Sequence, residues 1–157
     1  MPSNRTILIA IAIACFGVIG VALYLQHAKD MLPCPLCVLQ RYAFIITGIF
    51  ALIAAFAPYQ KVWAALALVS TAWGGLTVRK HIEVISNPGF TCGIDPLETM
   101  LNKIPTATGM PWLFRADGLC ESAGDPVMGL SVPHWSALWM GIILLSVLFV
   151  LARRVRQ

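Results

Sequence analysis

The chain has 157 residues, enough for one domain, and 59% of them are hydrophobic whereas only 11% are charged. A soluble globular domain carries about 25% charged residues, so this composition excludes an ordinary soluble protein and indicates a membrane protein. The net charge is +4, but no basic run is interleaved with aromatic residues, and we therefore expect no nucleic-acid binding.

Four apolar runs follow one another along the chain, and a membrane-spanning helix needs roughly 20 predominantly apolar residues. The runs cover residues 7–25, 42–57, 62–78 and 135–152. The first run has two rival interpretations, a signal peptide or a lipid attached to Cys15. Its length and the single basic residue before it, Arg5, favour an uncleaved anchor. We predict a single all-α membrane domain, a bundle of four transmembrane helices.

The connections between the runs differ in character. Residues 26–33 form a short polar connection within the outer loop 26–41. This loop ends on Arg41, whose long side chain can extend the second span to the membrane interface. Residues 58–61 form a tight turn, and Gly74 and Gly75 permit close helix packing in the third span. Residues 79–133 form a long loop that holds more than half of the prolines, so this loop cannot be one helix.

One part of the long loop has a helical pattern. Asp95, Pro96 and Glu98 occupy positions typical of an N-cap, a first and a third helical residue. Apolar residues follow at i, i+3, i+4 and i+7 spacing, namely Leu97, Met100, Leu101 and Ile104. We predict a short amphipathic helix that ends at Pro105 and packs either on the bilayer surface or on the protein itself.

Charge indicates how the bundle is oriented. Four spans put both termini on one side of the membrane, together with Lys61, the basic tail that starts at Arg153, and no acidic residue. All seven acidic residues fall on the other side. Positive charge near span ends favours the cytoplasmic side, so we expect cytoplasmic termini. The cysteines outside the spans then face an oxidising periplasm, in agreement with their even number.

The stretch Pro33-Cys34-Pro35-Leu36-Cys37 places two thiols two residues apart just before the second apolar run. Proline suits the first residue of a helix, which makes Cys34 the N-cap and Cys37 the third helical residue. Free N–H groups and the positive end of the helix dipole favour a thiolate there, and Arg41 adds a positive charge on the same face. A thiolate is the attacking species in disulfide exchange, so we predict a reactive pair.

Two further cysteines, Cys92 and Cys120, lie far apart in the long loop. They are candidates for a mobile redox pair that meets a soluble partner and then the first pair, or for a disulfide that only staples the loop. A zinc site made from all four cysteines, with His27 or His81 as a substitute ligand, is a further alternative. Cys15 lies within the first span, where inert packing is the favoured interpretation.

In these residues the chain resembles the DsbB family of bacterial inner-membrane proteins over nearly its whole length. The resemblance is carried by the C-x-x-C before the second span with Arg41 after it, the separated cysteines of the outer loop, and Pro133 with Trp135 opening the last span. Gln40 is a departure, because some members carry an acidic residue before the arginine.

The resemblance implies a thiol:quinone oxidoreductase of the inner membrane. Such an enzyme reoxidises a periplasmic thioredoxin-like dithiol oxidase of the DsbA type and hands the electrons to a membrane quinone, either ubiquinone or menaquinone. By position, Cys92 would form the mixed disulfide with the partner, Cys120 would exchange with Cys34, and Cys37 would be the thiolate beside the quinone. Arg41 and His81 would be the quinone-binding residues. No metal site is expected.

Two alternatives differ from this interpretation. The vitamin K epoxide reductase family also joins a helical bundle, a C-x-x-C and a quinone-type substrate, but its motif lies on the last core helix, after the separated pair. The order is reversed here, which counts against that family. The other alternative is a non-enzymatic membrane protein whose cysteines bind zinc or staple the loop.

Overall fold

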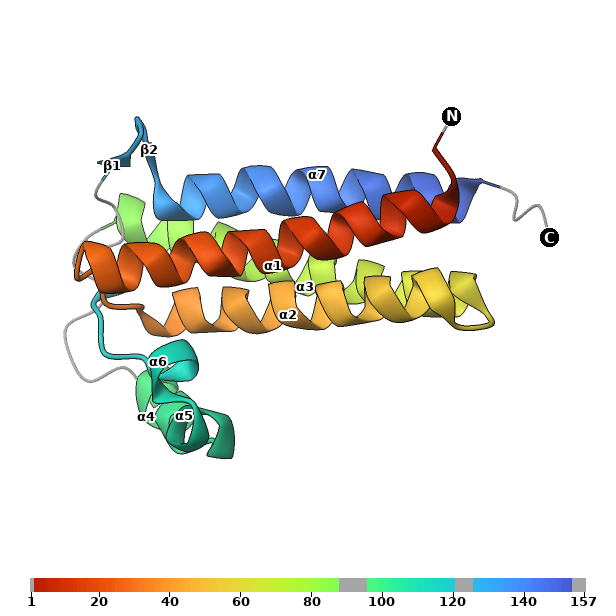
Figure 1. The fold of residues 1–157 in the computed structure, drawn as a ribbon. Coiled ribbons are helices and arrows are strands. Elements are labelled where there is room, and N and C mark those ends of the chain that lie inside the picture. Colours follow the sequence, from red (N-terminus) through yellow and green to blue (C-terminus); the bar gives the residue numbers. More distant parts are fainter. Residues whose placement is uncertain (1, 88–95, 121–125, 154–157) are drawn as a thin grey trace.

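The structure is a computed structural model that describes residues 2–87, 96–120 and 126–153. Four long helices run side by side (Figure 1): α1 (Asn4–Ala28), α2 (Pro35–Phe56), α3 (Gln60–Ser86) and α7 (Val132–Ala152). Among the described residues, these are the helices that are long and apolar enough to cross a membrane. The predicted all-α bundle of four transmembrane helices is confirmed.

The helices extend past the apolar runs at functionally important places. Helix α2 begins at Pro35, well before the second apolar run, and α3 continues to Ser86, well beyond the third. The predicted N-terminus of α2 is confirmed, because Pro35 stands in the first turn and the Cys34 sulfur caps the helix. As a result Cys37, Arg41 and His81 sit on regular helices, which restrict their side chains more than a loop would.

The bundle buries a narrow core and leaves apolar side chains on its outside. Leu8, Ile143 and Val147 are almost completely buried between the helices. Ile13 on α1 and Leu145 on α7, in contrast, are more than half exposed, at 67% and 68%. Exposed aliphatic side chains along a helix long enough to span a bilayer suit lipid contact rather than water.

Polar and small residues bring α2 and α3 close together. Thr47 and Thr71 hydrogen-bond across the interface at 3.2 Å, and the Ser70 hydroxyl donates to the Ala43 carbonyl at 3.2 Å. A Cβ added to Gly74 would lie 2.8 Å from Ala43 Cβ, so this glycine is needed for the contact. The predicted close packing is confirmed at Gly74. It is wrong for Gly75, which faces open space.

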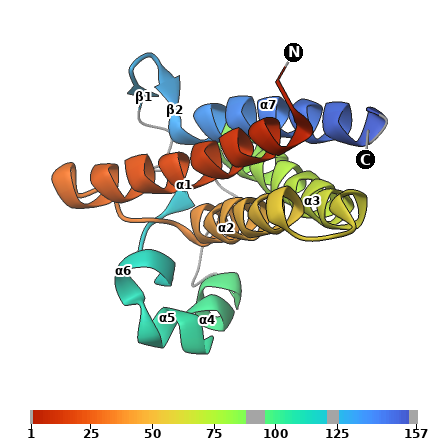
Figure 2. The ribbon, with the colours of Figure 1, turned by 45° about the vertical axis from the view of Figure 1, so that its right-hand side comes forward.

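The long loop contains three short helices, α4 (Pro96–Asn102), α5 (Pro105–Gly109) and α6 (Pro111–Phe114). Helix α4 matches the predicted amphipathic segment but ends at Asn102, and Asp95 lies outside the described residues. Figures 1 and 2 both place the three helices beside the start of α2, on the side away from α7. They are followed by a two-stranded hairpin, β1 (Pro126–Val127) and β2 (Leu130–Ser131), within a segment that was predicted as loop.

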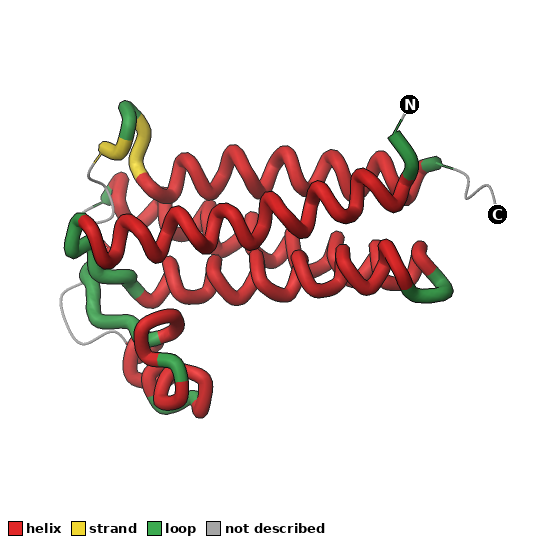
Figure 3. The backbone as a smooth tube through the Cα atoms, in the orientation of Figure 1, coloured by secondary structure: helices red, strands yellow, loops and turns green. Residues whose placement is uncertain are grey.

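The hairpin has a local explanation. Its two central residues, Met128 and Gly129, have φ values of 53° and 88°, the left-handed conformation that a tight two-residue hairpin requires. The indole N–H of Trp135 donates to the Val127 carbonyl at 2.9 Å, which holds the hairpin on the start of α7. Figure 3 shows this strand pair directly before α7.

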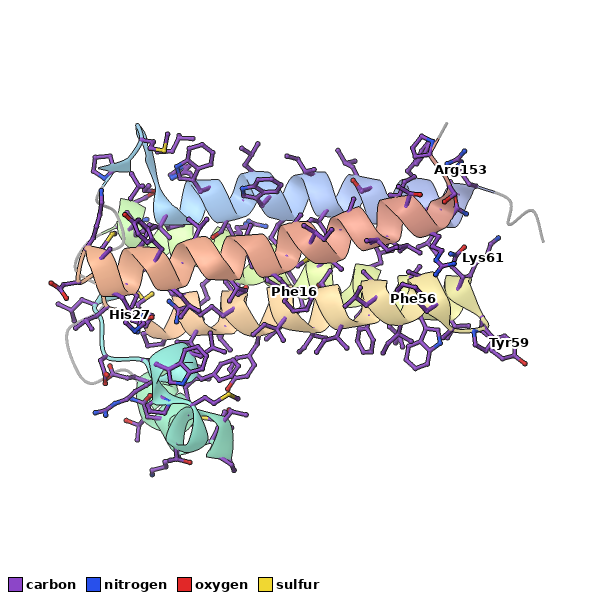
Figure 4. All side chains as sticks on the ribbon, in the orientation of Figure 1. Phe16, His27, Phe56, Tyr59, Lys61 and Arg153 are labelled. Carbon is purple, nitrogen blue, oxygen red and sulfur yellow. The ribbon has the colours of Figure 1, made fainter. Side chains whose placement is uncertain are left out.

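The two ends of the bundle differ chemically. The N-terminus and the end of α7 lie at one end, where Lys61, Tyr59 and Arg153 are also found (Figure 4). The Arg153 guanidinium donates to the Pro2 carbonyl at 2.9 Å there. The opposite end, at which α2 begins, carries the short loop helices and Cys34. We call it the cysteine end.

Candidate redox site

Cys34 and Cys37 occupy the first turn of α2 at the cysteine end. Their sulfurs lie 3.0 Å apart, with Cys34 Sγ donating to Cys37 Sγ. The backbone N–H of Cys37 donates in turn to Cys34 Sγ at 3.3 Å, which is the N-cap bond of α2. The start of the helix therefore holds the two thiols in contact with each other, as the formation of a disulfide between them requires.

Cys34 is held as a protonated thiol. The pKa of Cys34 is raised well above the ordinary cysteine value because its hydrogen bonds with Cys120 and Cys37, together with its burial, favour the neutral form. Cys120 is also buried and belongs to the same small cluster as Cys34 and Leu36. The structure thus brings together three of the four predicted redox cysteines, from two segments far apart in the sequence. Cys92, the fourth, lies outside the described residues.

His81 enters the site from α3 and is completely buried. Its Nε2 lies 3.5 Å from Cys34 Sγ, and its ring also hydrogen-bonds to the backbone of Cys120. On the other side of the ring, the Gln40 amide nitrogen donates to Nδ1 at 3.0 Å. In the sequence, Gln40 is visible only as a departure from the family pattern. Its place next to the predicted site residue Arg41 was the one available signal.

Arg41 projects from α2 into a buried position, with 6% of its surface exposed. One guanidinium nitrogen donates to the Leu113 carbonyl of α6 at 2.8 Å, which ties the loop helices to α2. The adjacent Tyr42 ring stacks on Phe114 with the ring centroids 4.4 Å apart. Arg41 therefore has a structural contact in the loop in addition to its place beside the thiols.

A cavity of about 420 Å³ opens beside this cluster, between the cysteine ends of α1, α2 and α7. Cys37, Gln40 and Arg41 contribute its polar wall from α2. Apolar side chains from α1 and α2, including Ile19 and Phe44, also line the cavity. His81 is not among the lining residues. A mostly apolar cavity with a few convergent polar groups suits a small apolar ligand that has a hydrogen-bond acceptor.

The residues just before Cys120 close this cavity on one side. Asp117, Gly118 and Leu119 line it, and we call them the wall segment. The backbone N–H groups of Asp117 and Gly118 both donate to the Pro33 carbonyl at 3.1 Å. The same short segment therefore positions Cys120 over Cys34 and completes the cavity next to Cys37.

Among the described residues, one group of side chains could hold a metal ion. The ligand atoms of Cys34, Cys37 and His81 lie within 4.8 Å of one another, close enough for a shared soft metal ion. His27, the other histidine considered as a ligand, bonds instead to the Leu23 carbonyl within its own helix. Cys15 is fully buried in the core of the bundle, in agreement with its predicted packing role.

Comparison with known proteins shows which family the chain belongs to. The family model described as disulfide bond formation protein DsbB matches residues 4–150. Proteins named disulfide bond formation protein B are similar over almost the whole chain. The protein from Cupriavidus necator is 46% identical, with 97% of this chain and 95% of the relative covered. The protein from Ralstonia nicotianae is 42% identical, with 99% and 98% covered.

The chain belongs to the DsbB family. The resemblance predicted from the cysteine pattern is confirmed, and the vitamin K epoxide reductase alternative is not supported. As a DsbB-family member, the chain is a disulfide-forming oxidoreductase and a multi-pass protein of the inner membrane. In this DsbB-family fold, the cysteine end brings Cys34, Cys37 and Cys120 together beside one cavity.

Proposed function

We propose that this DsbB-family protein reoxidises a periplasmic thioredoxin-like dithiol oxidase of the DsbA type and passes the electrons to a membrane quinone, ubiquinone or menaquinone. The observation that carries the proposal is that Cys37 contacts both the other thiol of its pair and the cavity. Its sulfur is 3.0 Å from Cys34 Sγ, and the same residue lines the cavity beside Arg41. Cys37 thus lies next to the thiol of Cys34 and also next to a cavity large enough for a ligand.

The loop pair carries out the first exchange. A thiolate of the partner attacks Cys92 of a Cys92–Cys120 disulfide, so that a mixed disulfide forms and the Cys120 thiolate leaves. The second partner thiol then displaces Cys92, and the partner departs with a disulfide. Each step breaks one S–S bond and forms one, and two electrons have moved to the loop pair.

The second exchange moves the electrons to the helix pair. Cys120 attacks Cys34 of a Cys34–Cys37 disulfide, and the Cys37 thiolate leaves beside the cavity. The hydrogen bond between the Cys34 and Cys120 side chains supports this choice of sulfur. Re-forming both disulfides then releases two electrons and two protons in all, which convert one quinone to its quinol.

The cavity residues fit a quinone. A bound quinone supplies the acceptor for two electrons, and its potential must exceed that of the partner, which is about −120 mV for a DsbA-type pair. The Arg41 guanidinium, a fixed cation with several N–H donors, would hold a quinone carbonyl oxygen. Ile19 and Phe44 would pack against the apolar ring, and the exclusion of water by such residues strengthens the contact with Arg41.

The orientation of the bundle belongs to the same proposal. With the termini in the cytoplasm, the cysteine end faces the periplasm, where a soluble partner reaches the long loop. The basic residues at the terminal end, including Lys61 and Arg153, support this orientation (Figure 4).

The test mixes the purified protein with a reduced DsbA-type partner and a soluble ubiquinone analogue, and follows the loss of quinone absorbance. We expect catalytic quinone reduction that is lost in Cys37→Ser and in Cys92→Ser variants. Cys15→Ser is the matched control, because Cys15 is a buried packing residue of α1 that does not line the cavity, and this variant should retain turnover. Partner oxidation without quinone consumption would contradict the proposed acceptor.

Zinc binding is a second candidate function, favoured by the close approach of Cys34, Cys37 and His81. A structural zinc site would yield about one zinc per chain after purification without added metal, and a chelator would unfold the protein. Turnover in the quinone assay by metal-free protein would eliminate this candidate.

A further inference from the structure

The buried contacts around His81 form one continuous chain of hydrogen bonds. The chain starts at the Gln40 amide, passes through the His81 ring to Cys34 Sγ, and continues from Cys34 Sγ to Cys37 Sγ. Gln40 and His81 are 4% and 0% exposed, so both side chains are buried. The chain therefore links α3 to both thiols of α2 through donors and acceptors that can be identified.

The partners of the ring determine which nitrogen carries the proton. The amide nitrogen of Gln40 can only donate, and it lies 3.0 Å from Nδ1, so Nδ1 is unprotonated and accepts. The proton of the neutral ring is then on Nε2, the atom 3.5 Å from Cys34 Sγ. The ring also hydrogen-bonds to the Cys120 backbone, and because Nδ1 already accepts from Gln40, Nε2 is the nitrogen left to donate to the carbonyl there.

We infer that Gln40 and His81 are positioning residues for the Cys120–Cys34 exchange: Gln40 fixes the Nε2–H tautomer of His81, and this N–H holds the Cys34 sulfur and the Cys120 backbone together. This inference rests on the proposed function, in which Cys120 exchanges with Cys34. It assigns His81 to the thiol side of the site, in agreement with its absence from the residues that line the cavity.

The inference also gives a meaning to glutamine at position 40. A glutamate there would be an acceptor and would require a proton on Nδ1. The ring would then direct a lone pair at Cys34, or would become an imidazolium. Gln40 therefore selects a neutral ring that donates towards sulfur, which an acidic residue in this place would not do.

The first experiment measures the tautomer without any turnover. Protein labelled with ¹⁵N-histidine is studied by NMR in detergent, and we expect His81 to show an unprotonated Nδ1 and a protonated Nε2. In Gln40→Glu the Nδ1 should become protonated, and in Gln40→Leu the ring should lose its single tautomer. Gln26→Leu, an equal change at a residue that bonds to the Trp112 carbonyl, should leave the His81 signals as they are. A protonated Nδ1 in the unchanged protein would overturn the inference.

The second experiment separates the two roles that His81 can have. Quinone reduction is driven either by the reduced partner, which must pass through Cys120, or by dithiothreitol acting directly on the Cys34–Cys37 pair. For Gln40→Leu we expect the partner-driven rate to fall about tenfold more than the dithiothreitol-driven rate, as for the loss of one buried hydrogen bond. An equal fall in both rates would overturn the inference and show that Gln40 acts through the cavity wall, to which it also contributes. Absence of quinone reduction by the unchanged protein with either reductant would instead refute the proposed function.

Discussion

Cys34 and Cys37 are neighbours in one helical turn, yet their surroundings give them different chemistry. Cys34 is the N-cap, is completely buried, and donates to the sulfur of Cys37. Cys37 lines the cavity instead. The two thiols are therefore divided into one that meets other thiols and one that meets the space beside Arg41.

The raised pKa of Cys34 predicts how reduced protein reacts with iodoacetamide. An ordinary cysteine ionises near pH 8.5. Because hydrogen bonds with Cys120 and Cys37 keep the Cys34 proton in place, its alkylation should begin only at higher pH. Above about pH 8.5 the unfolded chain loses this proton whereas the folded chain keeps it. The contribution of Cys34 to stability is therefore fully present below about pH 8.5 and declines above it.

The measurement is peptide mass spectrometry after alkylation pulses across a pH series. In Cys120→Ser, which removes the largest cause of the shift, the onset for Cys34 should move to lower pH. An unchanged onset in this variant would show that Cys120 does not stabilise the thiol.

Arg41→Lys tests the geometry of the cation. Lysine keeps the charge but lacks the planar set of donors with which Arg41 bonds to Leu113 while lining the cavity. We expect the KM for the quinone analogue to rise about tenfold, the order expected for one charge-assisted hydrogen bond. A KM equal to that of the unchanged protein would mean that Arg41 acts only through its charge.

At the level of elements, the wall segment links the loop to the helices. It is fixed by the hydrogen bonds of the Asp117 and Gly118 N–H groups to the Pro33 carbonyl. The Asn102 side chain also donates to the carbonyl of the neighbouring Ala116 at 2.8 Å and accepts from its N–H at 2.9 Å. Cys120, which contacts Cys34, directly follows the wall segment in the sequence. A movement of Cys120 away from Cys34 would therefore disturb one side of the cavity.

Gly118→Ala should distort the wall segment. A Cβ at this position would lie 2.2 Å from the Leu32 carbonyl oxygen, a backbone atom that cannot turn aside. We expect weaker binding of the quinone analogue by about tenfold or more, because overpacking of this kind typically costs about 1–3 kcal/mol. Binding is measured by titration of protein in detergent.

Gly109→Ala is the matched control for this change. It lies in the same loop, and its added Cβ would meet nothing within 4 Å. Equal binding by the two variants would show that the wall segment adjusts freely and does not shape the cavity.

For the whole molecule, stability depends on the contacts among the four long helices. Helix α2 packs against both α1 and α3, and α3 packs against α7. Gly74 lies where three helices meet, because an added Cβ would approach Ala43 on α2 and Met140 on α7. The apolar surface outside these contacts suits lipid and does not drive helix association in a bilayer.

Gly74→Ala should destabilise the bundle, whereas Gly75→Ala should have little effect. The added methyl at position 74 would lie 2.5 Å from Met140 Cε and 2.8 Å from Ala43 Cβ, but at position 75 it would meet open space. We expect a loss of about 1–3 kcal/mol for the first variant, measured by unfolding in detergent mixtures with circular dichroism. Equal unfolding curves for the two variants would contradict the packing described here.

The sequence by itself determined the elements that depend on local chemistry. Runs of apolar residues predicted four spans because length and hydropathy are properties of a segment. Pro35 after Cys34 predicted the start of α2 because the first turn of a helix tolerates proline. The cysteine pattern led to the DsbB family for the same reason, since the spacing of residues is visible without a fold.

Only the tertiary structure decided which distant residues meet. The approach of Cys120 to Cys34, the chain from Gln40 through His81, and the wall segment on Pro33 join parts of the sequence that no local pattern connects. Gly74 and Gly75 are indistinguishable as letters, yet one faces a neighbouring helix and the other faces open space. The physical reason is that helix rotation and loop closure depend on packing among all the segments at once, whereas helix formation depends on each segment alone.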